Sequence, residues 1–276
     1  MSGRFDTSRS NRSATRTPVA HHSIFMIGPL SYIGGKRTLA KEIIALFPKH
    51  TTYVEAFAGG AQVFFRKEPS PVEVLNDRDG EIVNFFRVCQ QHYEELVRYL
   101  RFMVVSRQWH ELLKATDPAG LTDIQRAARL MYLLKNSYAS LVLKLDYKCH
   151  VVQPPGFNPE RIPELIEEAH KRLARVQIEC LPYEEVITRY DRKETLFYLD
   201  PPYYARKLYR YNLEHEDFVK MADILVGIKG KFVLSLNDLP EVRAIFKRFK
   251  MHTVDLHYTA HQVAGRRHSE LLIRNF

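Results

Sequence analysis

The chain has 276 residues, 45% of them hydrophobic and 26% charged, a composition typical of a globular protein with one substantial core and room for an insertion. No apolar run approaches the roughly 18 residues that cross a membrane, so we expect no transmembrane helix. The three cysteines, Cys89, Cys149 and Cys180, lie far apart without a C-x-x-C pair. This spacing argues against a disulfide framework or a zinc site and favours a cytoplasmic protein that needs no metal.

The net charge of +9 is concentrated in two segments. Residues 1–23 carry four Arg against one Asp, and residues 86–175 carry fourteen Lys or Arg against ten acids. Excess basic charge of this kind is consistent with contacts to phosphates, and a solvated basic surface is an equal alternative. Residues 1–23 are also rich in Ser and Thr and have no apolar periodicity. They predict a disordered basic tail, and their composition leaves an organellar transit peptide open.

The first predicted elements form a strand–turn–helix–strand unit. In chain order, the apolar pattern predicts a helix over 38–47, a strand over 51–55, a tight turn at Gly59-Gly60 that leads into a helix through Phe64-Phe65, and a strand over 72–75. A helix that connects two strands is typical of a parallel α/β sheet. We therefore expect residues 24–85 to form the first part of an α/β domain.

The middle of the chain has helical periodicity and few strand signals. It predicts helices over 92–103, 123–138 and 163–175, with a capping box at Thr122-x-x-Gln125. Residues 137–158 have no clear period, and Pro154-Pro155-Gly156 indicates a loop there. We interpret 86–170 as an inserted, mainly helical domain.

The α/β pattern resumes over 171–276, which we expect to complete the first domain. It predicts strands over 176–180, 195–199, 231–236, 252–258 and 269–275, and helices over 183–190, 218–228 and 240–249. The last two strands follow each other with no helix between them. Such a succession predicts an antiparallel terminal pair at the edge of the sheet.

The most informative motif is Asp200-Pro201-Pro202-Tyr203, which follows the apolar strand over 195–199. The Asp200 carboxylate and the Pro201 carbonyl can both accept N–H bonds from a planar amine, and the Tyr203 ring can stack on the base that carries it. The prolines restrict the backbone so that the two acceptors can face one point. The motif therefore predicts a site that helps an adenine-like amine to attack an electrophile. An ordinary turn at the end of a strand is the alternative.

A second set of residues is typical of a nucleotide pocket. Gly59-Gly60 follows a strand, as in turns that let the backbone approach a ligand. Asp77 comes seventeen residues later, at the end of the next strand, where a carboxylate can bind ribose hydroxyls. Lys36 follows Gly34-Gly35 and could pair with a ligand carboxylate. A structural turn and a solvated surface loop are the alternatives.

Four motifs in this order resemble the Dam-type DNA adenine-N6 methyltransferases. They are Tyr32-Ile-Gly-Gly-Lys36, Val54-Glu55-Ala-Phe-Ala-Gly-Gly60, Leu75-Asn-Asp77 and Asp200-Pro-Pro-Tyr203. The resemblance covers about 24–276 and includes the closing strand, Ser269 to Asn275. It implies a Rossmann-like sheet that uses S-adenosyl-L-methionine, and a DNA target-recognition domain over 86–170. It further implies methyl transfer to the N6 amine of adenine in double-stranded DNA at a short site, after the base is flipped out.

The resemblance also implies roles for individual residues. The residues expected to bind the cofactor are Tyr32, Lys36, Glu55, Gly59, Asp77 and Asp200, and those expected to hold the target adenine are Asp200, Pro201, Pro202 and Tyr203. Residues 137–158 do not align with the recognition loops usual in the family, so the target sequence stays open.

Two basic segments are candidates for DNA contacts. Ala205 to Tyr211 alternates cations with aromatic residues, and we expect Arg206, Lys207 and Arg210 to contact phosphates or to cover the flipped base. Arg266-Arg267, between the last two strands, could also contact the DNA backbone. A plain exposed loop is the alternative for each segment.

Other functions fit part of the pattern. RNA adenine or the N4 amine of cytosine could replace DNA adenine as the substrate, because Asp-Pro-Pro-Tyr also occurs in cytosine-amine enzymes. A non-catalytic nucleic-acid-binding module could use the same core. A nicotinamide dehydrogenase would account for Gly59-Gly60 and Asp77 but leaves the motif at Asp200 unexplained.

Overall fold

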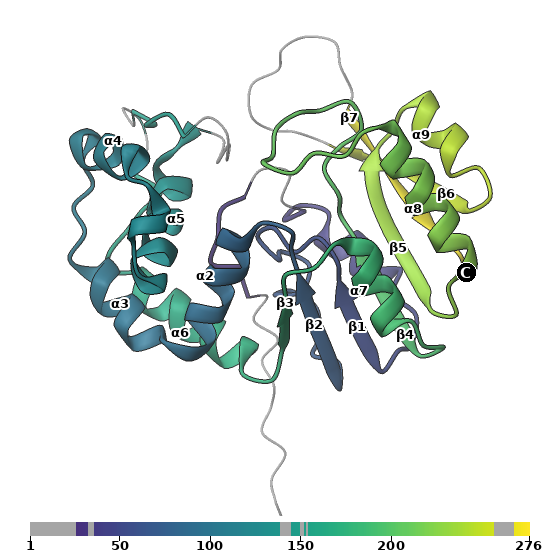
Figure 1. Cartoon of the computed structure of the whole chain (residues 1–276), viewed down its shortest axis with the longest axis horizontal. Helices are drawn as coiled ribbons and strands as arrows, with labels where there is room; N and C mark the ends of the chain where they lie inside the picture. The colour runs from purple at the N-terminus through teal and green to yellow at the C-terminus, as the bar shows by residue number, and fades with distance from the viewer. Residues whose placement is uncertain (1–25, 33–35, 139–144, 150–151, 153, 257–267) are drawn as a thin grey trace, which may run out of the picture.

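The computed structural model describes residues 26–32, 36–138, 145–149, 152, 154–256 and 268–276. This part of the chain forms one sheet with helices on both faces and a further group of helices beside it (Figure 1). The strands are β1 (Thr52–Glu55), β2 (Val72–Asn76), β3 (Gln177–Glu179), β4 (Thr195–Leu199), β5 (Lys231–Asn237), β6 (Lys250–Leu256) and β7 (His268–Arg274).

The strand order is β3-β2-β1-β4-β5-β7-β6. The strands from β3 to β5 are parallel, and β7 lies antiparallel between β5 and β6. The predicted Rossmann-like sheet and its antiparallel terminal pair are therefore confirmed. The order reverses between β1 and β4, and ligands of open α/β sheets bind outside the carboxyl ends of the strands at such a point.

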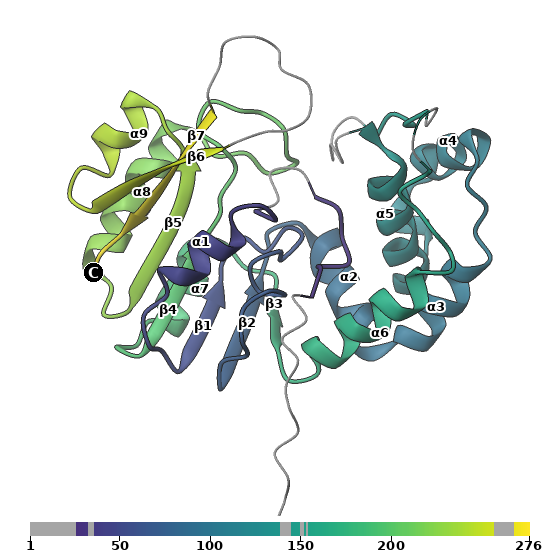
Figure 2. The same cartoon turned by 180° about the vertical axis from the view of Figure 1, so that it is seen from behind.

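The helices lie on the two faces of the sheet and beyond its β3 edge (Figure 1 and Figure 2). They are α1 (Ala40–Ala45), α2 (Gly80–Gln91), α3 (Tyr93–Arg101), α4 (Arg107–Ala115), α5 (Asp123–Asn136), α6 (Ile162–Leu173), α7 (Tyr183–Tyr190), α8 (His215–Gly227) and α9 (Pro240–Ile245), with the 3-10 turn η1 (Pro118–Gly120). Helices α7 and α8 cover the face of the sheet seen in Figure 1, and α1 covers the opposite face in Figure 2. Helices α3 to α6 gather beyond the β3 edge and form what we call the helical group.

Strand β4 shows why the two faces of the sheet are both covered. All of its residues are buried, as expected for a parallel strand with helices on each side. Leu196 and Tyr198 belong to the core on the α1 side, whereas Phe197 and Leu199 belong to the core under α7 and α8. This alternation is the two-residue period of an extended strand.

The core on the α1 side continues into the helical group. It contains Tyr198 and Ile43 as well as Phe85, Leu96 and Met131 from α2, α3 and α5. Helix α2 spans the predicted domain boundary between 85 and 86, and Phe85 is buried in this shared core. The sheet and the helical group are thus packed together, and the division into two domains stays a prediction.

Local signals predicted most elements, with some differences. The capping box of α5 is confirmed, because the Thr122 hydroxyl accepts from the Gln125 amide while the Gln125 side chain accepts from the Thr122 amide. The predicted helix through Phe64-Phe65 is wrong: residues 62–66 form consecutive turns. The preceding Ala61 has a φ of 49°, which is incompatible with the start of a regular α-helix. Among the helices that the structure describes, none combines the length and apolar character needed to cross a bilayer.

Candidate active site

A cavity of about 330 Å³ lies at the carboxyl ends of β1, β2 and β4. It is lined by every residue expected to bind the cofactor: Tyr32, Lys36, Glu55, Gly59, Asp77 and Asp200. The sheet brings these motifs together because β1 pairs with β2 on one side and with β4 on the other. Asp77 and Asp200 therefore face one common cavity, as the sequence predicted.

The turn after β1 is built around Gly59. Its φ of +48° lies in the left-handed region, and a Cβ there would lie 3.0 Å from the ring of Tyr32. Its amide donates to Asp77 Oδ2 at 2.8 Å. The absence of a side chain thus allows Tyr32 to pack on the turn while the turn binds the end of β2.

Asp77 is fixed by backbone amides. Besides Gly59, the amide of Asp79 donates to Asp77 Oδ1 at 2.8 Å. Burial raises the pKa of Asp77 to about 6, although these amide hydrogen bonds oppose the rise. The carboxylate is therefore held in one orientation with lone pairs left to accept ligand hydroxyls.

Glu55, the last residue of β1, has a different electrostatic environment. It is buried, and its Oε2 accepts a hydrogen bond from the Tyr53 hydroxyl at 2.7 Å. Burial raises the pKa of Glu55 to about 8, and the nearby Asp200 charge contributes to the rise. Glu55 is thus largely protonated at neutral pH when no cation lies beside it.

Asp200 is anchored through one of its two oxygens. Lys36 Nζ lies 2.6 Å from Asp200 Oδ1, and the Ser235 hydroxyl donates to the same oxygen at 3.1 Å. Both contacts that described side chains make with this carboxylate are on Oδ1, which leaves Oδ2 as an acceptor for a ligand. Burial raises the pKa of Asp200, and Lys36 opposes this rise.

The other residues of the motif take separate positions. Pro202 lines the cavity, whereas Pro201 is buried, and neither Pro201 nor Tyr203 is among the described residues that line it. The Tyr203 hydroxyl accepts from Lys36 Nζ at 3.3 Å and donates to Glu270 Oε2 at 2.8 Å. Stacking of the Tyr203 ring on a base, and acceptance by the Pro201 carbonyl, stay predictions.

Glu270 is a site residue that the sequence reasoning missed. It lies on β7, is 1% exposed, and its Oε1 is 3.2 Å from Lys36 Nζ. Burial lowers the pKa of Lys36, but Asp200 and Glu270 outweigh it and raise that pKa well above its usual value. The signal in the sequence was an acid at the start of the apolar run Leu271 to Ile273, where an unpaired charge would be costly.

The segment after Tyr203 forms one wall of the cavity. The ring of Tyr209 stacks on Tyr32, with centroids 6.0 Å apart, and Arg210 Nη1 lies 3.2 Å from Asp79 Oδ1. Arg210 was expected to contact DNA, but here it pairs with an acid at the rim of the cavity. Arg206 and Lys207 are exposed as expected, and Lys207 pairs with Glu214. Arg266 and Arg267 lie outside the described residues.

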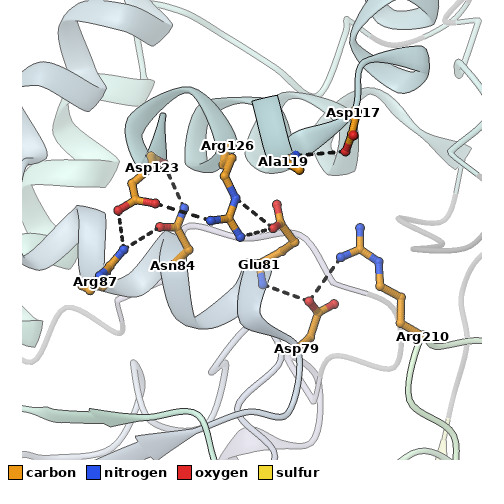
Figure 3. Close-up of polar contacts among 9 residues, drawn as sticks. All are labelled: Asp79, Glu81, Asn84, Arg87, Asp117, Ala119, Asp123, Arg126 and Arg210. Atoms are coloured by element: carbon orange, nitrogen blue, oxygen red, sulfur yellow. Dashed lines mark hydrogen bonds and ion pairs between the residues drawn. The ribbon is translucent and has the colours of Figure 1, made fainter. Parts of the chain in front are cut away.

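A polar network extends from this rim into the helical group (Figure 3). Asp79 caps α2 by accepting from the Glu81 amide at 2.9 Å. The Glu81 carboxylate pairs with Arg126 of α5, which also contacts Asp123. The N-termini of α2 and α5 are therefore joined beside the cavity.

This arrangement agrees with the comparison to known families. The family model described as D12 class N6 adenine-specific DNA methyltransferase matches residues 32–260. The chain belongs to this D12 class. Membership makes it an enzyme that methylates adenine in DNA and excludes the dehydrogenase and the non-catalytic module. The family-level prediction from the four motifs is thus confirmed.

Relatives of this D12-class enzyme cover most of its length. It is 28% identical over 268 residues to the type II methyltransferase M1.LlaDCHI of Lactococcus lactis subsp. cremoris, with 89% of this chain and 94% of that protein covered. It is 23% identical over 264 residues to the DNA adenine methylase of Escherichia coli strain K12, covering 86% and 90%. The solved structure of SMU.776, described as a methyltransferase complexed with SAH, aligns over 87% of this chain and 49% of its own at 11% identity, with a TM-score of 0.41.

The cavity of the D12-class enzyme fits its cofactor, S-adenosyl-L-methionine. Asp77 and Asp200 supply carboxylates to the lining that suit a positively charged sulfonium, and Tyr32 offers an aromatic surface beside the glycine turn. Asp77 supplies acceptors of the kind that bind ribose hydroxyls. Among the described residues, no group of three His, Cys, Asp or Glu side chains could hold a metal ion.

Proposed function

We propose that this D12-class enzyme methylates N6 of adenine at a short specific site in double-stranded DNA, after the target base has rotated out of the duplex. The observation that supports this most is the single cavity lined by Asp77 and Asp200, the two ends of the expected cofactor and base sites. An adenine amine inside a duplex cannot reach such a cavity, so extrusion is required at a cost of a few kcal/mol. Stacking of the base on an aromatic side chain can offset about 1–3 kcal/mol.

Asp200 would orient the adenine amine. When bound, S-adenosyl-L-methionine supplies an electrophilic methyl group on a sulfonium sulfur. Asp200 Oδ2 and the Pro201 carbonyl accept the two N–H bonds of the amine, which directs the nitrogen lone pair at the methyl carbon. Lys36 and Ser235 fix the other Asp200 oxygen, so the carboxylate cannot rotate away. Alignment of this kind can lower the barrier of a displacement by roughly 7–11 kcal/mol.

The remaining lining residues would hold the cofactor. Asp77 accepts ribose hydroxyls, Tyr32 and Gly59 contact the nucleoside, and Glu55 lies near the methionine amino group. A bound ammonium beside Glu55 would lower the pKa of that carboxyl and allow it to ionise. The ammonium group of the cofactor would thus supply the positive charge that favours the ionised form of Glu55.

DNA would bind across the opening of the cavity and the helical group. We propose that residues 86–170 recognise the target sequence, that Arg206 and Lys207 contact phosphates, and that Arg266 and Arg267 add contacts to the backbone. The basic charge of residues 86–175 supports this placement. We also propose that the enzyme acts in the cytoplasm, within a restriction–modification system like those that the name of its Lactococcus relative indicates.

The direct test is to identify the methylated product. Purified enzyme is incubated with labelled S-adenosyl-L-methionine and duplex DNA, which is then digested to nucleosides. We expect the label in N6-methyl-2′-deoxyadenosine. Mapping of the modified positions should return one short sequence. Label in N4-methylcytosine, or in RNA rather than in duplex DNA, would contradict the proposal. A scattered pattern of methylated adenines would contradict only the specific site.

A further inference from the structure

Glu270 places a second carboxylate next to the active-site ammonium. Its Oε2 accepts from the Tyr203 hydroxyl, whereas its Oε1 forms an ion pair with Lys36. That oxygen lies 3.2 Å from Lys36 Nζ, which in turn lies 2.6 Å from Asp200 Oδ1. The buried Lys36 ammonium is therefore set between the buried Glu270 carboxylate and the partly exposed Asp200 carboxylate, and it is closer to Asp200.

The reaction changes the charge of one of these carboxylates. As the N–C bond forms, the adenine nitrogen becomes positive and must lose a proton. Asp200 accepts its hydrogen bond and is the nearest base, so the proton would pass to Asp200 Oδ2. Asp200 is then neutral, and Lys36, which is only 4% exposed, loses its principal counter-charge. The loss of this negative charge beside a buried ammonium would oppose the step.

We propose that Glu270 is a positioning residue that takes over Lys36 while Asp200 holds the proton released by the methylated amine. The inference rests on the proposed function and deepens it, because it assigns the proton to Asp200 and the compensating charge to Glu270. Glu270 does not line the cavity among the described residues and acts through Lys36.

The step balances without a further reactant. The nitrogen lone pair forms the N–C bond, and the electron pair of the broken C–S bond stays on sulfur. One N–H proton moves to Asp200 Oδ2. Lys36 keeps its three protons and moves one hydrogen bond from Asp200 Oδ1 to Glu270 Oε1. When Asp200 releases its proton after the product leaves, Lys36 returns.

The proposal predicts a defined pH dependence. The titratable groups that face this cluster are Lys36, Glu55, Tyr198, Asp200, Tyr203, Tyr209 and Glu270. Glu270→Gln removes one of the two anions that pair with Lys36, and the loss of that negative charge near Asp200 lowers the pKa of Asp200. The acidic limb of the rate profile then moves to lower pH. The rate on the plateau falls, because Asp200 is a weaker base and Lys36 has no second anion.

The experiment is single-turnover methyl transfer, measured over a pH series with full-length enzyme, saturating S-adenosyl-L-methionine and a duplex that carries the mapped site. For Glu270→Gln we expect a plateau rate about tenfold to a hundredfold lower, with unchanged affinity for cofactor and DNA. Glu270→Asp keeps the charge but shortens the reach to Lys36. It should retain the acidic limb of the wild type with a smaller loss of rate.

The matched control is Glu73→Gln. Glu73 is also buried and paired with two cations, Lys67 and Arg172, but it does not line the cavity. This variant should melt at a lower temperature and keep the wild-type pH profile. A Glu270→Gln enzyme with the wild-type rate and profile overturns the inference. So does one that loses cofactor binding in step with its rate. Should Glu270→Gln not fold, a folded Glu270→Asp with the full wild-type rate overturns it.

Failure of the wild type to methylate duplex DNA would instead refute the proposed function. Methylation by the wild type together with an unaffected Glu270→Gln refutes only the role of Glu270. The two failures are therefore distinguishable in one set of assays.

Discussion

At the scale of single residues, the acids of the cavity differ because each has a different partner. Glu55 meets a tyrosine hydroxyl and has a pKa raised by burial to about 8. Asp77 meets two backbone amides, and burial raises its pKa only to about 6. The Asp200 carboxylate forms an ion pair with the Lys36 ammonium. At neutral pH Glu55 is thus largely protonated whereas Asp77 is ionised, which suits Asp77 for accepting hydrogen bonds from hydroxyl groups.

The raised pKa of Asp77 predicts that cofactor binding weakens in acid. Below a pH of about 6 Asp77 gains a proton and loses its charge-assisted hydrogen bonds to hydroxyls. Calorimetric titration of S-adenosyl-L-methionine should therefore show affinity falling as the pH drops through this value. Asp77→Asn should bind weakly and lack this dependence; a wild-type dependence in that variant would contradict the assignment.

The raised pKa of Asp77 also affects the free energy of unfolding, in the direction opposite to its effect on cofactor affinity. Between the ordinary value of 3.8 and about 6, folded Asp77 retains a proton that the unfolded chain releases. The contribution of Asp77 to the free energy of unfolding therefore falls as the pH rises through that window.

Gly59 offers a second prediction at this scale. In Gly59→Ala the new methyl group would lie 3.0 Å from the Tyr32 ring, in a left-handed conformation that costs alanine about 1 kcal/mol. We expect the affinity for S-adenosyl-L-methionine to fall about tenfold or more, since Tyr32 must move. Gly80→Ala is the control, because a Cβ at Gly80 meets nothing within 4 Å. Equal affinities for the two variants in calorimetry would contradict this account.

At the scale of elements, the segment after Tyr203 has two parts with different surroundings. Its first part, with Arg206 and Lys207, is exposed. Its second part is held over the cavity by the stacking of Tyr209 on Tyr32 and by the pairing of Arg210 with Asp79. The cations and aromatic residues that alternate in this segment therefore lie partly on the exposed surface and partly on the wall of the cavity.

The two parts of this segment predict different effects of substitution on cofactor binding and on DNA binding. Arg210→Ala should weaken binding of S-adenosyl-L-methionine about tenfold, because the wall of the cavity loses a charge-assisted contact. Its DNA affinity should keep the wild-type dependence on salt. Arg206→Ala/Lys207→Ala should instead reduce the slope of log affinity against log salt by about one for each lost phosphate contact, at unchanged cofactor affinity. Fluorescence anisotropy of labelled DNA over a salt series measures the slope for both variants. A reduced slope in Arg210→Ala would contradict the position of Arg210 at the wall of the cavity.

Local patterns predicted the parts of the site that depend on neighbouring residues. The turn at Gly59, the acid after β2 and the motif after β4 each follow a buried strand, and parallel strands deliver their carboxyl ends to one edge. Asp79, Tyr209 and Glu270 were missed because their roles depend on partners far away in the sequence. In particular, no local motif in the sequence shows that β7 pairs with β5 in an antiparallel register.

At the scale of the whole molecule, the sheet and the helical group share one hydrophobic core. The core on the α1 side runs from Tyr198 through Phe85 to Met131, and the network of Asp79, Glu81 and Arg126 joins the two parts beside the cavity (Figure 3). The sequence predicted an insertion from its change of periodicity. It could not show that α2 continues across the expected boundary, because periodicity does not reveal which face a helix packs against.

The shared core predicts that the molecule unfolds as one cooperative unit. Urea unfolding followed by fluorescence of Trp109, in the helical group, should coincide with the far-ultraviolet dichroism of the whole chain. Arg126→Ala should lower the free energy of unfolding by about 1–3 kcal/mol, since Glu81 would lose its partner while mostly buried. Two separate transitions would show that the helical group is an independent domain.

The antiparallel insertion of β7 also bears on when the enzyme becomes competent during synthesis. β7 follows every other strand of the sheet in the sequence, yet it lies between β5 and β6 and supplies Glu270. A nascent chain that has already made the glycine turn and the Asp200 motif still lacks both the second neighbour of β5 and the second anion beside Lys36. We therefore expect a nascent chain that lacks β7 to methylate DNA more slowly than the finished enzyme.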